Sequence, residues 1–133
     1  MTPEEWWRRA NEKRLSAGRL LDERKSSRDC YHLVGTAVEF AFKAVIAKRE
    51  RFNQWPDQAS RPDLYTHNLR VLFNLLGVDH SALPPSLRAS LKTVLSWSRS
   101  MEYQGGRMPR KEAAQMYTAA FGTGGVIEWL KTL

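Results

Sequence analysis

An arginine and a histidine stand six positions apart in the stretch RPDLYTH, residues 61–67. The guanidinium of Arg61 could grip a phosphate, and the imidazole of His67 could move protons near neutral pH. Together these two groups are the minimum for cleaving RNA without a metal ion. The context favours a simpler role, because Pro62 predicts an extended chain at Arg61, which would separate the two side chains. We interpret Thr66 as the N-cap of a helix and His67, in its first turn, as a contact between the loop and a core helix.

A glutamate and a lysine, Glu39 and Lys43, stand four positions apart with the acid first, which is the favourable order for an ion pair on a helix. Two interpretations are open. The pair could line a cleft in a helical bundle and hold a polar group of a ligand. It could equally be an ordinary surface pair that contributes a few tenths of a kcal/mol.

A third group of candidate residues lies in the second half of the chain and combines cations, an acid and an aromatic ring. Arginine can bind phosphate through a fork of donors, and tyrosine can stack on a base. The alternative is an Arg–Glu pair that closes a helix end. The candidate ligand-binding residues are Arg99, Glu102, Tyr103 and Arg107.

The net charge of +7 comes from 21 Lys and Arg against 14 Asp and Glu, and its excess is uneven. Residues 80–111 hold six of the basic residues and one acid, Glu102. A basic surface around residues 88–111 would attract RNA, a nucleotide or an acidic protein. It could also be a solvated face that only keeps the protein soluble.

Several classes of function have no support in the sequence. His32 and His80 lack further ligands at metal-site spacing, and no phosphate-binding or dinucleotide-binding glycine motif is present, so we expect neither metal nor cofactor. The one cysteine, Cys30, cannot form an internal disulfide. The charged N-terminus is unlike a signal peptide, and the longest apolar stretch contains Glu39 and Lys43. We expect a cytoplasmic protein that does not enter the membrane.

The hydrophobic pattern is helical almost throughout. A first helix is predicted from Thr2, which would cap it, to residues 23–25. A second helix is predicted between Tyr31 and Lys48, where apolar residues recur at steps of three and four and form one stripe. Phe40 and Phe42 lie outside that stripe, which predicts that this helix is buried on more than one side. Later helices are expected at residues 69–76, with Gly77 as the stop, from Pro84 and Pro85, and from Arg110, with a break at 104–109. The GTGG of 122–125 is expected to kink the last helix, end it, or allow close packing against a neighbour. The prediction is a single all-α domain, 1–133, with four to five helices in an up-and-down bundle.

Two adjacent tryptophans, Trp6 and Trp7, lie on the first predicted helix. Neighbouring positions on a helix cannot both face the same core. One of the two rings is therefore expected to be partly exposed or buried against a partner, which makes both of them candidate interface residues.

Three segments resemble the HEPN superfamily of small helical bundles: AVEFAFKAVIAKRE (37–50), YTHNLRVLFNLLGV (65–78) and WSRSMEY (97–103). The shared features are Glu-x-x-x-Lys on the second long helix, His-x-Leu at the start of a shorter one, and an Arg-and-Tyr segment before the last. The resemblance covers about residues 2–130 and implies a homodimer. Many members are RNases of toxin–antitoxin and defence systems, and others bind nucleotides or proteins, often beside a nucleotidyltransferase.

The RNases of that superfamily carry an arginine and a histidine with four to six residues between them, near the start of the last long helix. Here the matching arginine is Arg99, and no histidine follows it, because the last one in the chain is His80. The resemblance therefore favours a non-catalytic, homodimeric binding module that engages a partner protein such as a nucleotidyltransferase or antitoxin, a nucleotide or RNA. The alternative is a metal-independent endoribonuclease that uses Arg61 and His67.

Overall fold

The computed structural model describes residues 1–103 and 105–133, with nothing described of the side chains of residues 102 and 103. No strand occurs among the described residues, so the all-helical prediction is confirmed for them. Short 3₁₀ helices η1 to η4 connect the longer elements. The α-helices are α1 (Pro3–Leu20), α2 (Ser27–Arg49), α3 (Leu69–Leu75), α4 (Pro85–Leu95), α5 (Arg110–Phe121) and α6 (Val126–Leu130), and the 3₁₀ helices are η1 (Arg24–Ser26), η2 (Pro62–Leu64), η3 (His80–Ala82) and η4 (Arg99–Tyr103).

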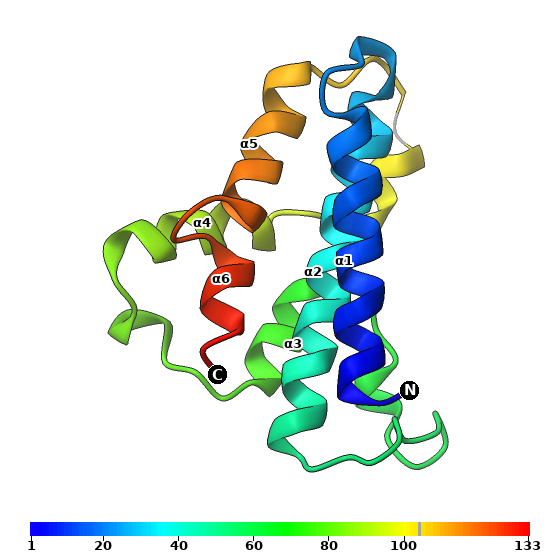
Figure 1. Ribbon diagram of the computed structural model, residues 1–133, viewed down its shortest axis with the longest axis vertical. Helices are drawn as coiled ribbons and strands as arrows, with labels where there is room; N and C mark the ends of the chain where they lie inside the picture. The colour runs from blue at the N-terminus through cyan, green and yellow to red at the C-terminus, as the bar shows by residue number, and fades with distance from the viewer. Residues whose placement is uncertain (104) are drawn as a thin grey trace.

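The long helices α1 and α2 form an antiparallel hairpin that runs the length of the molecule (Figure 1). α1 begins with the predicted capping box, in which Thr2 Oγ1 accepts from the Glu5 amide and Glu5 Oε2 accepts from the Thr2 amide. It ends at Leu20, earlier than predicted. The Leu21 amide bonds the carbonyl of Gly18, three residues back, so the helix tightens and then gives way to η1.

α2 is the central helix of the fold. It packs against α1, α3, α5, α6 and η4, so it is buried on more than one side, as its pattern predicted. Its length and apolar composition, counted over residues 24–49, would also suit a membrane span, but 78% of the most apolar stretch is buried inside the protein. That degree of burial is what the core helix of a bundle requires. Cys30 lies in this buried part, and burial raises the pKa of its thiol.

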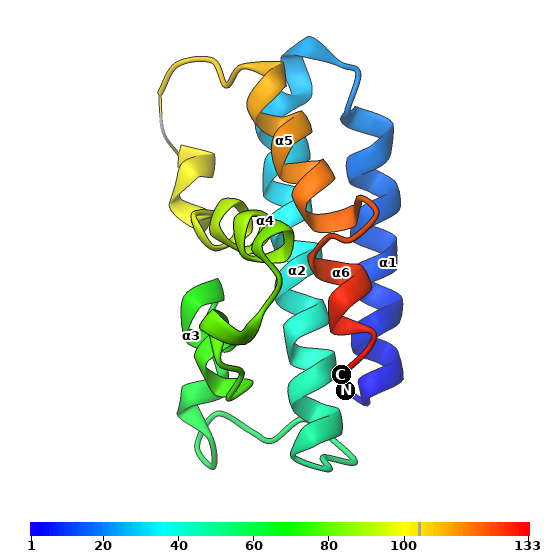
Figure 2. The same cartoon turned by 90° about the vertical axis from the view of Figure 1, so that its left-hand side faces the viewer.

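The remaining helices pack around this hairpin in different directions. α4 runs across the long helices and is seen end-on in Figure 2, so the up-and-down description fits α1 and α2 better than it fits α4. Gly77 ends the α3 segment with a φ of 70°, as predicted, and Pro85 opens α4. The GTGG stretch ends α5, and Gly124 takes a φ of 72° there. α6 can therefore fold back against α2.

A glycine in the middle of α2 lets a tryptophan approach its backbone. A Cβ atom built on Gly35 would lie 1.9 Å from the Trp97 ring, which is far inside van der Waals contact. Trp97 is buried and lies two residues before η4, so its packing on Gly35 brings η4 against α2. This packing places Arg99 over the central helix.

We expect Gly35→Ala to lower the free energy of unfolding by about 1–3 kcal/mol, because the added methyl group overpacks the Trp97 contact. The sign is diagnostic, since Gly→Ala in the middle of a helix normally stabilises by about 0.5–1 kcal/mol. Urea denaturation measures the difference. Gly105→Ala is the control, because nothing lies within 4 Å of its added methyl group. Equal or greater stability of the Gly35 variant would contradict the packing.

Candidate functional site

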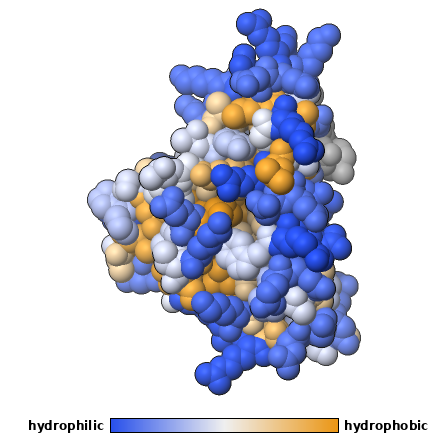
Figure 3. All heavy atoms as spheres, viewed as in Figure 1, coloured by the Kyte–Doolittle hydropathy of each residue, from blue (hydrophilic) through white to orange (hydrophobic). Residues whose placement is uncertain are grey.

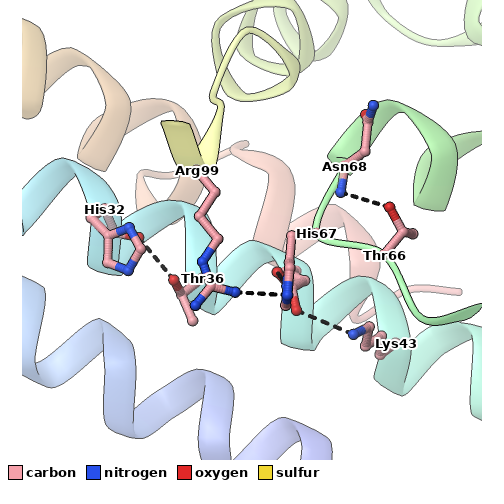
Figure 4. A network of polar contacts seen from close by, with 8 residues as sticks. His32, Thr36, Lys43, Thr66, His67, Asn68 and Arg99 are labelled. Atoms are coloured by element: carbon pink, nitrogen blue, oxygen red, sulfur yellow. Dashed lines mark hydrogen bonds and ion pairs between the residues drawn. The ribbon is translucent and has the colours of Figure 1, made fainter. Parts of the chain in front are cut away.

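Four side chains from three separate segments form one chain of polar contacts on the surface of α2 (Figure 4). Lys43 Nζ donates to Glu39 Oε2 at 3.1 Å, within α2. Glu39 Oε1 lies 2.9 Å from Nδ1 of His67, in the loop before α3. His67 Nε2 lies 2.7 Å from Nη1 of Arg99, at the start of η4. We call these four residues the polar cluster.

The positions of the protons in the polar cluster follow from the arginine. A guanidinium has donors only, so the Arg99 Nη1 contact requires His67 Nε2 to be the acceptor. The ring proton is then on Nδ1, which donates to the Glu39 carboxylate. In this arrangement the imidazole is neutral, and both of its nitrogens are engaged.

The polar cluster runs from the interior to the solvent. Glu39 and Lys43 are 3% and 7% exposed, so the sequence-based alternative of an ordinary surface pair is wrong. Lys43 Nζ also lies 5.3 Å from the ring centroid of buried Trp6, a cation–π contact. The side chain of His67 is 54% exposed, and Arg99 is exposed. An incoming ligand can therefore reach only the His67–Arg99 end.

Capping at the start of α3 sets the position of His67. The predicted N-cap, Thr66, is wrong: Asn68 is the N-cap, and its side chain accepts from the amides of Arg70 and Val71. Thr66 Oγ1 instead accepts from the Asn68 amide, which tightens the preceding turn. His67 thus lies before the helix rather than in its first turn, and contacts α2 through Glu39. The predicted contact between this loop and the core helix is confirmed.

Arg61 has other partners than His67. Its Nε and Nη2 atoms bond the two carboxylate oxygens of Asp63 at 2.9 and 2.8 Å, and its guanidinium lies 5.8 Å from the Phe52 ring centroid. The arginine that contacts His67 is Arg99, which comes 32 residues later in the chain. Spacing along the sequence suggested one Arg–His pair, and the fold forms a different one.

The other predicted site residues are spread over the molecule. Arg107 lines a different hollow with Arg28, away from the polar cluster's contacts. Glu102 and Tyr103 belong to η4, but their side chains lie outside the described residues. Trp6 is buried against Phe40 and Trp55.

Trp7 is half-buried, as expected for one of two adjacent rings, and lines a hollow with residues of α5 and α6 while it also packs against the cluster that contains Trp6. No partner chain is present, so the predicted interface role of both tryptophans stays a prediction.

A shallow hollow of about 520 Å³ opens beside the exposed end of the polar cluster. His67, Arg70 and Arg99 contribute basic side chains to its lining, and no acid is among the described residues that line it. Sequence reasoning missed Arg70, whose only signal was its place three residues after His67. Within the part of the chain that the structure describes, no group of three or more His, Cys, Asp and Glu side chains is arranged to hold a metal ion. What this site can do is hold an anion beside an oriented imidazole.

Mutation of either member of the buried Glu39–Lys43 pair should be costly, because the other charge stays behind in the interior. We expect Glu39→Gln and Lys43→Met each to lower the free energy of unfolding by about 3–5 kcal/mol. The double variant should lose clearly less than the sum of the two, which denaturation of all four proteins would measure. Simple additivity would show that the two charges do not depend on each other.

Comparison of the chain with protein-family models, curated proteins and solved structures finds no match. The likeness to the HEPN superfamily therefore stays a prediction, made from three segments of the sequence. What the chain does has to be inferred from its own residues, from the charge they carry and from the contacts that the fold gives them.

Proposed function

We propose that this chain is a non-catalytic, HEPN-like binding module that holds a phosphate group of a nucleotide or RNA at Arg99, which His67 positions. The observation that carries the proposal is the contact between Arg99 Nη1 and His67 Nε2 at 2.7 Å. It leaves the other donors of an exposed guanidinium available beside an exposed ring. Arg99 was among the binding residues expected from the sequence. His67 accepts a hydrogen bond from its guanidinium, and Glu39 in turn holds the His67 ring.

The charge around this position supports an anionic ligand. Arg70 lines both the hollow beside the polar cluster and a neighbouring hollow of about 640 Å³. Arg88 and Lys92, one turn apart on α4, line that second hollow, and no acid is among the described residues that line either of them. Of the basic residues between 88 and 111, Arg88, Lys92 and Arg99 thus lie near Arg70 of α3, whereas Arg107 lines a different hollow. Phosphate contacts from such a surface would be strong at low salt and weaker at high salt.

The same contact argues against catalysis by the resting site. A histidine acts as a general base through an unprotonated nitrogen that can reach the nucleophile. In His67 the only such nitrogen is Nε2, and Arg99 already occupies it. The proton on Nδ1 is directed to Glu39. Arg99 would have to leave His67 before the ring could accept a proton from a substrate.

Further elements of the proposal rest on the superfamily resemblance. They are a homodimer and a protein partner such as a nucleotidyltransferase or an antitoxin, in a toxin–antitoxin or defence system. The cytoplasmic location expected from the sequence is also part of the proposal.

We expect Arg99→Ala to weaken binding of a fluorescent adenine nucleotide or a short labelled RNA by roughly tenfold, because a charge-assisted hydrogen bond to phosphate is lost. Arg61→Ala is the matched control, and should leave the affinity unchanged because its guanidinium is held by Asp63. Fluorescence anisotropy at two salt concentrations gives both affinities. Equal losses in the two variants, or no binding by the wild type, would contradict the proposal.

A second candidate function is metal-independent RNA cleavage, and one observation favours it. The Glu39 carboxylate contacts the His67 imidazole, which in turn contacts the Arg99 guanidinium. Glu39 thus orients the ring as it would in a general base, and Arg99 could bind the scissile phosphate. This version replaces Arg61 with Arg99 as the partner of His67. It requires substrate to draw Arg99 away from Nε2.

Labelled RNA incubated with the protein in a chelator distinguishes the two functions. For a binding module we expect RNA to stay intact with the wild type and with His67→Ala. Cleavage that persists in chelator, disappears in His67→Ala and Arg99→Ala, and survives in Arg61→Ala would instead establish the nuclease. A gel of the products over time gives the answer, and a heat-denatured sample controls for contaminating RNase.

A further inference from the structure

Another hollow is lined by residues of α1 and of the α5–α6 segment. In Figure 2, α1 and α6 lie on one side of α2 and α3 lies on the other. The volume of this hollow is about 270 Å³, just below the range of about 300–1,000 Å³ that is typical of small-molecule sites. None of the residues proposed to bind phosphate lines it. We call it the α1–α6 pocket.

The base and walls of the α1–α6 pocket are apolar. Ala10 and Ile127 are buried, and the half-buried rings of Trp7 and Phe121 stand around them. In Figure 3, hydrophobic residues gather between α1 and α6 with hydrophilic side chains around them. A short hydrocarbon or aromatic body would bury apolar area here on both sides of the contact.

The polar residues that line the α1–α6 pocket are Asn11 and two cations, Arg14 and Lys131. The Arg14 guanidinium lies 5.5 Å from the Phe121 ring centroid, a cation–π contact that uses none of its N–H donors. Among the described residues, neither Arg14 nor Lys131 forms an ion pair. The described lining of the α1–α6 pocket holds these two cations and no acid.

We propose that the α1–α6 pocket binds a small amphipathic anion, a carboxylate on a short aliphatic or aromatic body. The body lies against Trp7, Phe121 and Ile127, and the carboxylate accepts from Arg14 and Lys131. Arginine offers two parallel donors to a carboxylate, and the contact to Phe121 has already ordered this one. The site is independent of the phosphate site proposed above.

Charge makes a second copy of the chain a poorer occupant than a small anion. The chain carries a net charge of +7, and two copies that met at this face would bring Arg14 and Lys131 of each toward the cations of the other. In a symmetric dimer the same patch appears on both sides, so like charges would face each other. A bound anion would offset the positive charge of Arg14 and Lys131, whereas a second copy of the chain would double it.

The test follows the amide signals of isotope-labelled protein during titration with octanoate, and with octanol as the uncharged probe. We expect saturable shifts at the residues that line the α1–α6 pocket, with octanoate binding roughly tenfold more tightly than octanol. Arg14→Gln/Lys131→Gln should remove this preference. Arg9→Gln/Lys13→Gln, which changes the charge equally on residues outside the pocket lining, should keep it. Asn11→Trp, at an exposed lining position, should block both probes.

Three results would overturn the proposal. The first is the absence of saturable shifts at millimolar octanoate. The second is shifts that centre on other residues, or an equal loss of the octanoate preference in both double variants. The third is pocket signals that move with protein concentration rather than with octanoate, which would make this face an interface between copies. Because Arg99 takes no part, none of these results bears on phosphate binding.

Discussion

The buried ion pair between Glu39 and Lys43 is the constraint on which the rest of the site depends. Two opposite charges lie in the most enclosed helix of the fold, where removal from water is costly unless each finds partners. Lys43 has Glu39 and the face of Trp6, and Glu39 has Lys43 and the Nδ1–H of His67. The loop before α3 therefore supplies a hydrogen bond to the buried carboxylate of Glu39 in α2, and this contact attaches a surface segment to the core.

The outer half of the polar cluster depends on packing as well as on charge. Gly35 leaves room for Trp97 against the α2 backbone, and Trp97 carries η4 with it. Arg99 then reaches His67 from above while Glu39 holds the ring from below. An oriented imidazole between a carboxylate and a guanidinium suits two chemistries. The partner of His67 Nε2 decides between them. While Arg99 occupies that nitrogen, it cannot accept a proton from a substrate, and we therefore favour binding.

The two proposed sites differ in the kind of ligand that their surfaces suit. The surface around His67, Arg70 and Arg99 is shallow, exposed and basic, as suits a phosphate that stays partly in water. The α1–α6 pocket has a buried apolar base with cations among its lining residues, as suits a ligand that must lose water from its body and keep its charge paired. α2 separates them, so each can be tested without disturbing the other.

The helices could be read from the sequence because their signals are local. The capping box at Thr2, the stop at Gly77, the start at Pro85 and the break at GTGG each involve residues within a few positions of one another. The burial of α2 on several sides also followed from the off-stripe Phe40 and Phe42. The candidate residues Glu39, Lys43, His67 and Arg99 were all visible as chemical types, although their grouping was not.

Only the tertiary structure decided which arginine meets His67. Spacing favoured Arg61, but that side chain is satisfied by Asp63 two residues away, while Arg99 arrives through the packing of Trp97 on Gly35. Likewise, an i, i+4 pair of Glu and Lys has the same pattern whether it is exposed or buried, and the fold buries this one beneath Trp6 and His67. Local signals determine where a helix begins and ends, whereas contacts between distant segments depend on which surfaces the whole chain can bury together.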